Sequence, residues 1–241
     1  MKNNFLLILL FALLMAIITP SCSHNQSNSE QSNMEHKDHE HKKHAHSHDG
    51  FKGKISIEEI AKRLESPQRD SAEQPQKVVQ FIGEIKGKTI LDIGAGTGYY
   101  TMRFAEKGAF VIAADVNQEL QDYLEKRIEK SNFKNVELRK TQYDSPLLKN
   151  EEIDIAFIAN TYHHIENRID YFTKVKKGLK SNGELVVVDY FNADLPKDII
   201  APPMEIRVSV DQLISELKKC GFTNFITDVN SLKYQYILKT K

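Results

Sequence analysis

The chain has 241 residues, which is room for one folded domain and an additional segment. Lysine plus arginine and aspartate plus glutamate each number 33, so the formal net charge at pH 7 is zero. This balance argues against nucleic acid as the main partner, because phosphate binding favours a basic surface. The two cysteines, Cys22 and Cys220, lie too far apart in the sequence to indicate a disulfide framework or a pair of metal ligands.

The first residues have the pattern of a secretory signal. Lys2 precedes an uninterrupted apolar run over 5–18, which is shorter than the roughly 20 apolar residues of a membrane-spanning helix. Cys22 follows a small residue after this run, which resembles a bacterial lipoprotein signal. We therefore expect residues 1–21 to be removed, Cys22 to be lipidated, and the protein to lie in the cell envelope, anchored to the membrane. Ordinary cleavage, an uncleaved anchor and a cytoplasmic location are the alternatives.

The segment 22–50 is polar and of low complexity, so it cannot bury enough surface to fold and is predicted to be a disordered tether. It contains six closely spaced histidines: His36, His39, His41, His44, His46 and His48. Neutral imidazoles at this spacing on a flexible chain can converge on Zn²⁺, Cu²⁺ or Ni²⁺. The sequence predicts weak, exchangeable metal binding, with a solvated spacer as the alternative.

The predicted folded domain covers 51–241 and begins with two helices. Apolar residues at helical spacing predict a helix over 57–64, and the Ser-Pro pair that follows predicts its end. A second helix is predicted from Pro75 to Ile85, with the proline in its first turn. Arg69 lies between them beside an aspartate, and the sequence leaves open whether this pair is a surface ion pair or part of a site.

A strand, a glycine loop and a helix are predicted next. The apolar run 89–93 is typical of a buried strand in a parallel sheet. Gly94, Gly96 and Gly98 then allow a sharp bend against which a ligand can lie, with a plain tight turn as the alternative. The spacing differs from the dinucleotide fingerprint, because Tyr99 stands where a third glycine is required. This disfavours a nucleotide-dependent oxidoreductase.

The loop and the acid before it point to a cofactor. Asp92 and the G-x-G-x-G sequence after it resemble motif I of the class I S-adenosylmethionine-dependent methyltransferases. The resemblance implies that Asp92, Gly94, Gly96 and Gly98 bind S-adenosyl-L-methionine, with the loop against its methionine moiety and ribose.

Two more strands are expected to lead to cofactor ligands. The run 109–115 ends in Asp115, where a carboxylate can accept hydrogen bonds from both ribose hydroxyls. Asn117 is available as the N-cap of the next helix, so Asp115 is not required for that role. After a third strand over 135–140, the resemblance implies an acidic residue near the adenine, for which Gln142 and Asp144 are the candidates.

Catalytic candidates follow the fourth predicted strand, 152–160. Asn160 leads into Thr-Tyr-His-His-Ile, which resembles motif IV of many small-molecule methyltransferases. The resemblance implies that Asn160 contacts the cofactor and that Tyr162 and His163 contact the acceptor or remove its proton. His164 is expected to cap or pack against the next helix.

The rest of the chain continues the alternation of strands and helices. The predicted elements are a helix over 166–180, a strand over 185–189, a lid-like connection over 192–203, a helix opening at the capping box 209–212, and strands over 224–229 and 233–239. This pattern predicts an α/β fold with a doubly wound, mostly parallel seven-stranded sheet. The resemblance implies the strand order 3-2-1-4-5-7-6 with the last strand antiparallel.

The expected function is S-adenosylmethionine-dependent methyl transfer to an unidentified small-molecule acceptor. The sulfonium already activates the methyl group, so the protein's main tasks are to align the reactants and exclude water, and no metal requirement follows. The alternative is an envelope metal-binding lipoprotein whose methyltransferase-like domain is a non-catalytic scaffold. Export and this cofactor conflict, because the cofactor is made in the cytosol.

Overall fold

The computed structural model describes residues 56–197 and 199–241. The chain divides into two units, Met1–His46 and Ser47–Lys241, and all described residues belong to the second. The predicted signal, Cys22 and the histidine-rich tether therefore lie outside the described residues. Within the described ranges, no helix has both the length and the apolar character needed to cross a membrane.

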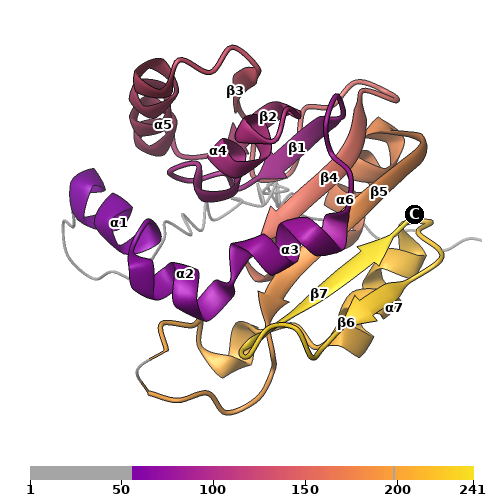
Figure 1. The fold of residues 1–241 in the computed structure, drawn as a ribbon. Coiled ribbons are helices and arrows are strands. Elements are labelled where there is room, and N and C mark those ends of the chain that lie inside the picture. Colours follow the sequence, from indigo (N-terminus) through magenta and orange to yellow (C-terminus); the bar gives the residue numbers. More distant parts are fainter. Residues whose placement is uncertain (1–55, 198) are drawn as a thin grey trace, which may run out of the picture. The chain divides into compact units, whose positions relative to one another are not determined.

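A seven-stranded sheet with the order β3-β2-β1-β4-β5-β7-β6 forms the centre of the domain (Figure 1). β7 is antiparallel to β5 and to β6, whereas the other neighbouring strands are parallel. The predicted fold class and strand order are confirmed. The strands are β1 (Thr89–Ile93), β2 (Phe110–Asp115), β3 (Val136–Lys140), β4 (Ile153–Ala159), β5 (Leu179–Tyr190), β6 (Ile226–Asp228) and β7 (Gln235–Thr240).

Helices cover both faces of the sheet, with α3 in front of it and α7 behind it in Figure 1. The α-helices are α1 (Ile57–Leu64), α2 (Pro67–Glu73), α3 (Pro75–Ile82), α4 (Tyr99–Glu106), α5 (Gln118–Ser131), α6 (Arg168–Gly178) and α7 (Val210–Lys219). Two short 3-10 helices are η1 (Tyr162–His164) and η2 (Met204–Ile206). One apolar cluster joins α3 and α4 to the sheet, and a second joins α6 and α7 to it. Since both faces are covered, the central strands are apolar on both sides, as expected for a parallel sheet.

The helix α2 corrects the sequence prediction of a break over 66–70. Ser66 is the N-cap, and its Oγ accepts a hydrogen bond from the backbone N–H of Arg69 at 3.2 Å. Pro67 occupies the first turn, where a missing N–H leaves no hydrogen bond unmade. Gln74, in the left-handed region with φ 46°, then separates α2 from α3. The Ser-Pro pair therefore ends one helix and begins another.

The strand β5 is also longer than predicted, because it begins at Leu179 rather than at residue 185. Its first residues include the exposed Lys180, Ser181 and Asn182. Polar residues and a glycine at this end of the strand are typical of a turn, so the sequence pattern predicts a turn here and not a strand. The additional residues lie at the amino end of β5, whereas Asp189 and Tyr190 lie at its carboxyl end.

Candidate functional site

The sequence candidates gather at the carboxyl ends of the parallel strands. The strand order reverses between β1 and β4, which place their carboxyl ends side by side. In open α/β sheets, ligands bind in the crevice beyond the strands at such a switch point. The glycine loop follows β1, Asp115 ends β2, Asn160 follows β4, and β5 ends close by with Asp189 and Tyr190.

The glycine loop requires its glycines for both backbone conformation and packing. Gly94, Gly96 and Gly98 all have positive φ, at 70°, 57° and 87°. A Cβ at Gly94 would lie 2.6 Å from Thr161 Oγ1, and a Cβ at Gly98 would lie 2.3 Å from Leu124 Cδ1. At Gly96 the nearest atom is 3.8 Å away. The outer two glycines therefore permit close packing, whereas Gly96 has the freer surface.

Asp115 is fixed beside this loop. One carboxylate oxygen accepts the N–H of Gly96 at 2.8 Å, and the other accepts the N–H of Asn117 at 2.8 Å. Asn117 is the side-chain N-cap of α5, as predicted. A carboxylate offers about four lone-pair positions, so Asp115 retains acceptor capacity for two hydroxyl donors. This geometry fits a ribose.

Asp92 lies beneath the loop with only 3% of its surface exposed. Its Oδ2 accepts the hydroxyl hydrogen of Thr101 at 2.6 Å. Burial raises the pKa of Asp92 to about 6, the Thr101 hydrogen bond opposes this shift, and the charge of Asp115 adds to it. Two carboxylates near one loop favour a positively charged ligand.

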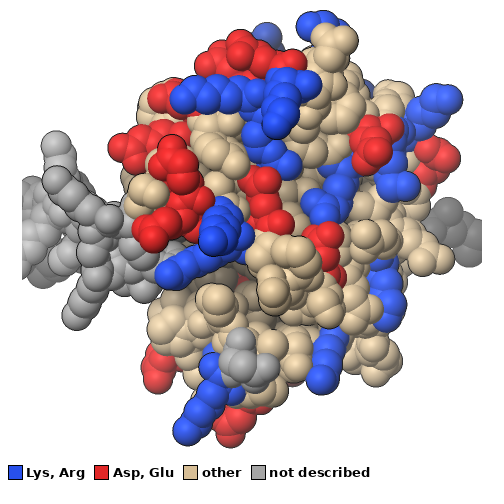
Figure 2. Space-filling view, turned by 60° about the vertical axis from the view of Figure 1, so that its left-hand side comes forward, with Lys and Arg blue, Asp and Glu red and all other residues tan. Residues whose placement is uncertain are grey.

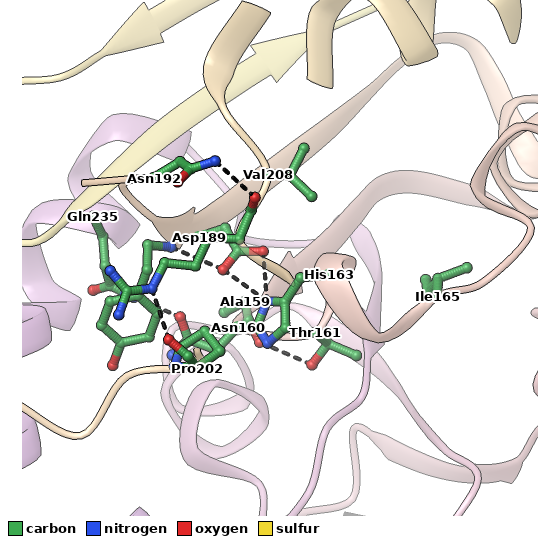
Figure 3. Close-up of polar contacts among 12 residues, drawn as sticks. Ala159, Asn160, Thr161, His163, Ile165, Asp189, Asn192, Pro202, Val208 and Gln235 are labelled. Atoms are coloured by element: carbon green, nitrogen blue, oxygen red, sulfur yellow. Dashed lines mark hydrogen bonds and ion pairs between the residues drawn. The ribbon is translucent and has the colours of Figure 1, made fainter. Parts of the chain in front are cut away.

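A buried histidine–aspartate pair lies after β4 and at the end of β5. His163 Nδ1 lies 2.9 and 3.0 Å from the two carboxylate oxygens of Asp189 (Figure 3). The side chains are only 2% and 0% exposed, and the Asp189 carboxylate also accepts the N–H of Tyr190 at 2.8 Å. A carboxylate at Nδ1 selects the tautomer with its proton on that nitrogen, which leaves the Nε2 lone pair to accept a proton.

The two neighbours of His163 have other surroundings. Tyr162 is fully buried, its ring stacks on Phe172, and its hydroxyl donates to Glu216 of α7 at 2.8 Å. Burial, followed by this hydrogen bond, raises the pKa of Tyr162. The hydroxyl is therefore held by α7, and the catalytic role of Tyr162 stays a prediction. His164 is exposed and its ring contacts that of His163, with centroids 4.2 Å apart.

Asn160 lies at the switch point with a left-handed φ of 53°. Its side-chain amide donates to Glu73 of α2 at 3.0 Å and accepts from Gln235 of β7 at 2.6 Å. The side chain thus links three elements of the fold. Its predicted contact with a cofactor stays a prediction.

Gln142 and Asp144 lie in the turn after β3, and both are exposed. Lys174 of α6 donates to the backbone carbonyl of Asp144 at 2.8 Å. Thr141 is buried, and its N–H donates to the carbonyl of Asp115 at 3.0 Å, which joins the start of this turn to the end of β2. Adenine contacts by Gln142 or Asp144 stay a prediction.

The connection between β5 and α7 lies beside the histidine–aspartate pair, and Figure 3 shows Pro202 and Asn192 of this connection near Asp189. Arg207 donates to the carbonyls of Pro202 and Ala193, both at 2.7 Å. Tyr190 follows Asp189 in the chain, and its hydroxyl donates to the Ile200 carbonyl at 3.1 Å. The connection exposes three large apolar side chains, those of Ile200, Met204 and Ile206. The role of this connection as a substrate lid stays a prediction.

Sequence reasoning missed Asp189 and Glu73, and it left open whether Arg69 belongs to a site. Asp189 carried a usable signal, because it ends an apolar strand just as Asp115 does. No sequence pattern pointed to Glu73, because its contact with Asn160 forms only when α2 packs against the end of β4. No group of three or more histidine, cysteine, aspartate or glutamate side chains able to bind a metal ion occurs among residues 56–197 and 199–241.

The family of the chain follows from comparison with known proteins. Residues 84–239 match the family model of a methyltransferase domain, which is more than half of the chain. The chain therefore belongs to this family of methyltransferases.

Individual relatives are more distant. The chain is 27% identical over 160 residues to the tRNA U34 carboxymethyltransferase of Haemophilus influenzae, covering 61% of this chain and 49% of that protein. It is 24% identical over 174 residues to the demethylmenaquinone methyltransferase of Tropheryma whipplei, covering 60% and 70%. The chain thus spans about half the length of the first of these relatives. A SAM-dependent methyltransferase from Aquifex aeolicus has a TM-score of 0.68 at 26% identity, covering 78% of this chain and 98% of that one.

Proposed function

We propose that this protein transfers the methyl group of S-adenosyl-L-methionine to a small molecule whose nucleophilic atom arrives protonated. The observation that carries the proposal is the buried His163–Asp189 pair at the same sheet edge as the glycine loop and Asp115. Membership of the methyltransferase family supports the reaction class. When bound, the cofactor supplies a methyl group already activated by its positive sulfonium.

The residues of the crevice fit this cofactor. Asp115 has free acceptor positions for the ribose hydroxyls, and Gly96 leaves the backbone open to close approach. The carboxylate of Asp92 beneath the loop favours a cation above it. These three features bind and orient the cofactor, and none of them takes part in proton transfer.

His163 is the general base in this proposal. A hydroxyl or an amine is a poor nucleophile until its proton leaves, and Nε2 of His163 accepts that proton as the new bond to carbon forms. Asp189 stabilises the resulting imidazolium by its two short contacts to Nδ1. Because the pair is buried, water is excluded from the reacting atoms and the electrostatic interaction is strong.

The surroundings of the pair support a small acceptor with an apolar part. The connection between β5 and α7 exposes Ile200, Met204 and Ile206 beside the site. The face in Figure 2 mixes acidic and basic side chains without a broad field of one sign. A continuous basic surface, which a nucleic-acid acceptor favours, is not present on that face.

The test uses the full chain with methyl-labelled S-adenosylmethionine and two separate acceptor pools, a small-molecule extract and total tRNA. We expect label in the small-molecule pool, and we expect His163→Ala to lower its rate by about 10²-fold or more. Label in the tRNA pool alone would contradict the small-molecule acceptor. Equal labelling by wild type and His163→Ala would contradict the base.

We also propose that the protein is anchored in the cell envelope through Cys22 and that its histidine-rich segment binds Zn²⁺, Cu²⁺ or Ni²⁺ weakly. The apolar run before Cys22 and the six histidines support this proposal. Cell fractionation with Cys22→Ala as the control tests the anchor. A wild-type chain found wholly in the cytosolic fraction at full length would contradict export.

A further inference from the structure

The connection between β5 and α7 presents an apolar patch to solvent, formed by Ile200, Met204 and Ile206. These side chains are 77%, 42% and 42% exposed. In the part of the chain that the structure describes, nine large apolar side chains are exposed, and three of them fall within 200–206. Single exposed apolar side chains are ordinary, whereas a group of them marks a surface that binds a protein or a membrane.

The backbone that carries the patch is held in place by hydrogen bonds. The guanidinium of Arg207 donates to the carbonyls of Pro202 and Ala193, both at 2.7 Å, and so braces the connection from within. The Tyr190 hydroxyl holds the Ile200 carbonyl at 3.1 Å, which fixes the other side of Pro202. Apolar side chains in water forgo the free energy of burial. Their exposure on a braced backbone therefore indicates that a partner covers them.

The shape and the size of the patch select among the possible partners. In Figure 1 the connection projects as a loop beyond the carboxyl end of β5. A projecting loop does not enclose a small ligand, because small-molecule sites are concave. A stable interface with a second copy or another protein takes about 20–30 residues on each side, and the patch has three side chains. A lipid bilayer requires neither a groove nor a large matched surface, since apolar side chains enter it individually.

Charge and position also favour a bilayer. The run 199–204 contains no charged residue, so its entry into lipid leaves no charge without water. Pro202, in the same run, lies beside Asp189 in Figure 3, which places the patch at the edge of the crevice that contains the histidine–aspartate pair. The apolar run before Cys22 independently indicates attachment to a membrane. A lipid on Cys22 holds the chain near the bilayer, and the patch determines which side of the domain faces it.

We infer that Ile200, Met204 and Ile206 insert into the surface of a lipid bilayer and that the methyl acceptor is an apolar molecule taken from that bilayer. The crevice then opens onto the membrane. The reaction is that of the proposed function: the hydroxyl or amine of the acceptor gives its proton to His163 Nε2 as its new bond to carbon forms. The acceptor class rests on the proposed function, whereas insertion is measured without any methyl transfer.

The first test uses tryptophan fluorescence, because the chain contains no tryptophan of its own. Ile200→Trp places the probe in the patch. Phe110→Trp is the matched control, since Phe110 is 43% exposed and begins β2, at the amino end of the sheet and opposite the crevice. Each full chain is reconstituted with phosphatidylcholine vesicles whose acyl chains carry bromine, a fluorescence quencher. We expect a blue shift and loss of emission for Ile200→Trp and no change for Phe110→Trp.

The second test measures the acceptor. The full chain with methyl-labelled S-adenosylmethionine is given vesicles made from a total lipid extract. Aspartate at all three positions, Ile200, Met204 and Ile206, should lower labelling of the lipid pool about 10-fold or more, because each loses its apolar contact with the bilayer. Aspartate at Ile226 and Val229, which are 55% and 47% exposed elsewhere, should leave labelling unchanged. Calorimetric affinity for S-adenosylhomocysteine within about 2-fold of wild type reports that both variants are folded.

The remaining outcomes separate the two parts of the inference from the proposed function. Equal quenching of the two tryptophans would overturn insertion through the patch. Emission from Ile200→Trp that is already blue-shifted without vesicles would show that a second copy or another part of the chain covers the patch, and would also overturn it. Insertion with label only in a water-soluble pool would overturn the apolar acceptor. Insertion with no label in any pool would contradict the proposed function while supporting the membrane contact.

Discussion

Replacing Asp92 by asparagine should stabilise the ligand-free protein at neutral pH. The carboxylate is 3% exposed and has one side-chain hydrogen bond, from Thr101, that an asparagine Oδ1 can also accept. The substitution therefore removes a buried charge while it conserves shape and partner. A charge that costs stability and faces a ligand is typical of a functional site.

The magnitude follows from the pKa of Asp92, which rises from 3.8 to about 6 on folding. Between these values the folded state binds more protons than the unfolded state, so stability falls as the pH rises through this window. The loss is complete above about pH 6 and amounts to about 3 kcal/mol, at about 1.4 kcal/mol per pH unit. The advantage of Asp92→Asn should therefore grow by about 2 kcal/mol between about pH 4.5 and 7.5.

Urea denaturation of wild type and variant at the two pH values measures this difference, and any constant effect of the substitution cancels. Asp154→Asn is the control with the opposite sign. Burial acts to raise the pKa of Asp154, but its bonds to Lys180 and to the Thr89 N–H outweigh burial and lower that pKa. Its loss should therefore destabilise the protein by nearly the same amount at both pH values, because the stability from a lowered pKa is lost only below about pH 4. A gap between wild type and Asp92→Asn that does not change with pH would refute the reasoning.

Two other predictions concern the loop and the base. Gly98 and Gly221 both have φ 87°, but only Gly98 has a neighbour, Leu124, at 2.3 Å from an added Cβ. Alanine at Gly221 should cost about 1–2 kcal/mol for its left-handed conformation, and alanine at Gly98 should cost about 1–3 kcal/mol more for overpacking. Equal costs in urea denaturation would contradict the packing argument. Asp189→Asn should lower the rate of label transfer about 10²-fold or more, because an asparagine amide can stabilise the wrong tautomer of His163. The same variant should leave the calorimetric affinity for S-adenosylhomocysteine within about 2-fold, because the His163–Asp189 pair does not bind the cofactor. A rate close to wild type would remove Asp189 from the mechanism.

Much of the fold was predictable because its signals are local. Apolar runs with an acid at or next to their last residue, as at Asp115 and Asp92, mark central strands and their carboxyl ends. Glycine spacing and the N-cap Asn117 fixed the loop and the start of α5. The start of β5 was missed because exposed polar residues around Ser181 have turn propensity, and strand pairing with β4 overrides it.

The site was predictable only where its residues share one segment. His163 was identified from its own motif, but its partner Asp189 lies 26 residues away and the contact depends on β4 pairing with β5. The same motif gave no means to separate His163 from Tyr162, whose hydroxyl is bound by Glu216 of α7. The link from Glu73 to Asn160 spans 87 residues, and only the packed structure shows it.

The central claim is that the crevice at the ends of β1 and β2 binds S-adenosyl-L-methionine. Calorimetric titration of the full chain with this cofactor, for wild type and for Asp115→Ala, tests it most directly. We predict saturable one-site binding by wild type and a loss of about 10-fold or more in the variant, because the two ribose hydroxyls lose a charged acceptor. No measurable heat with wild type, or equal affinity in both proteins, would contradict the account.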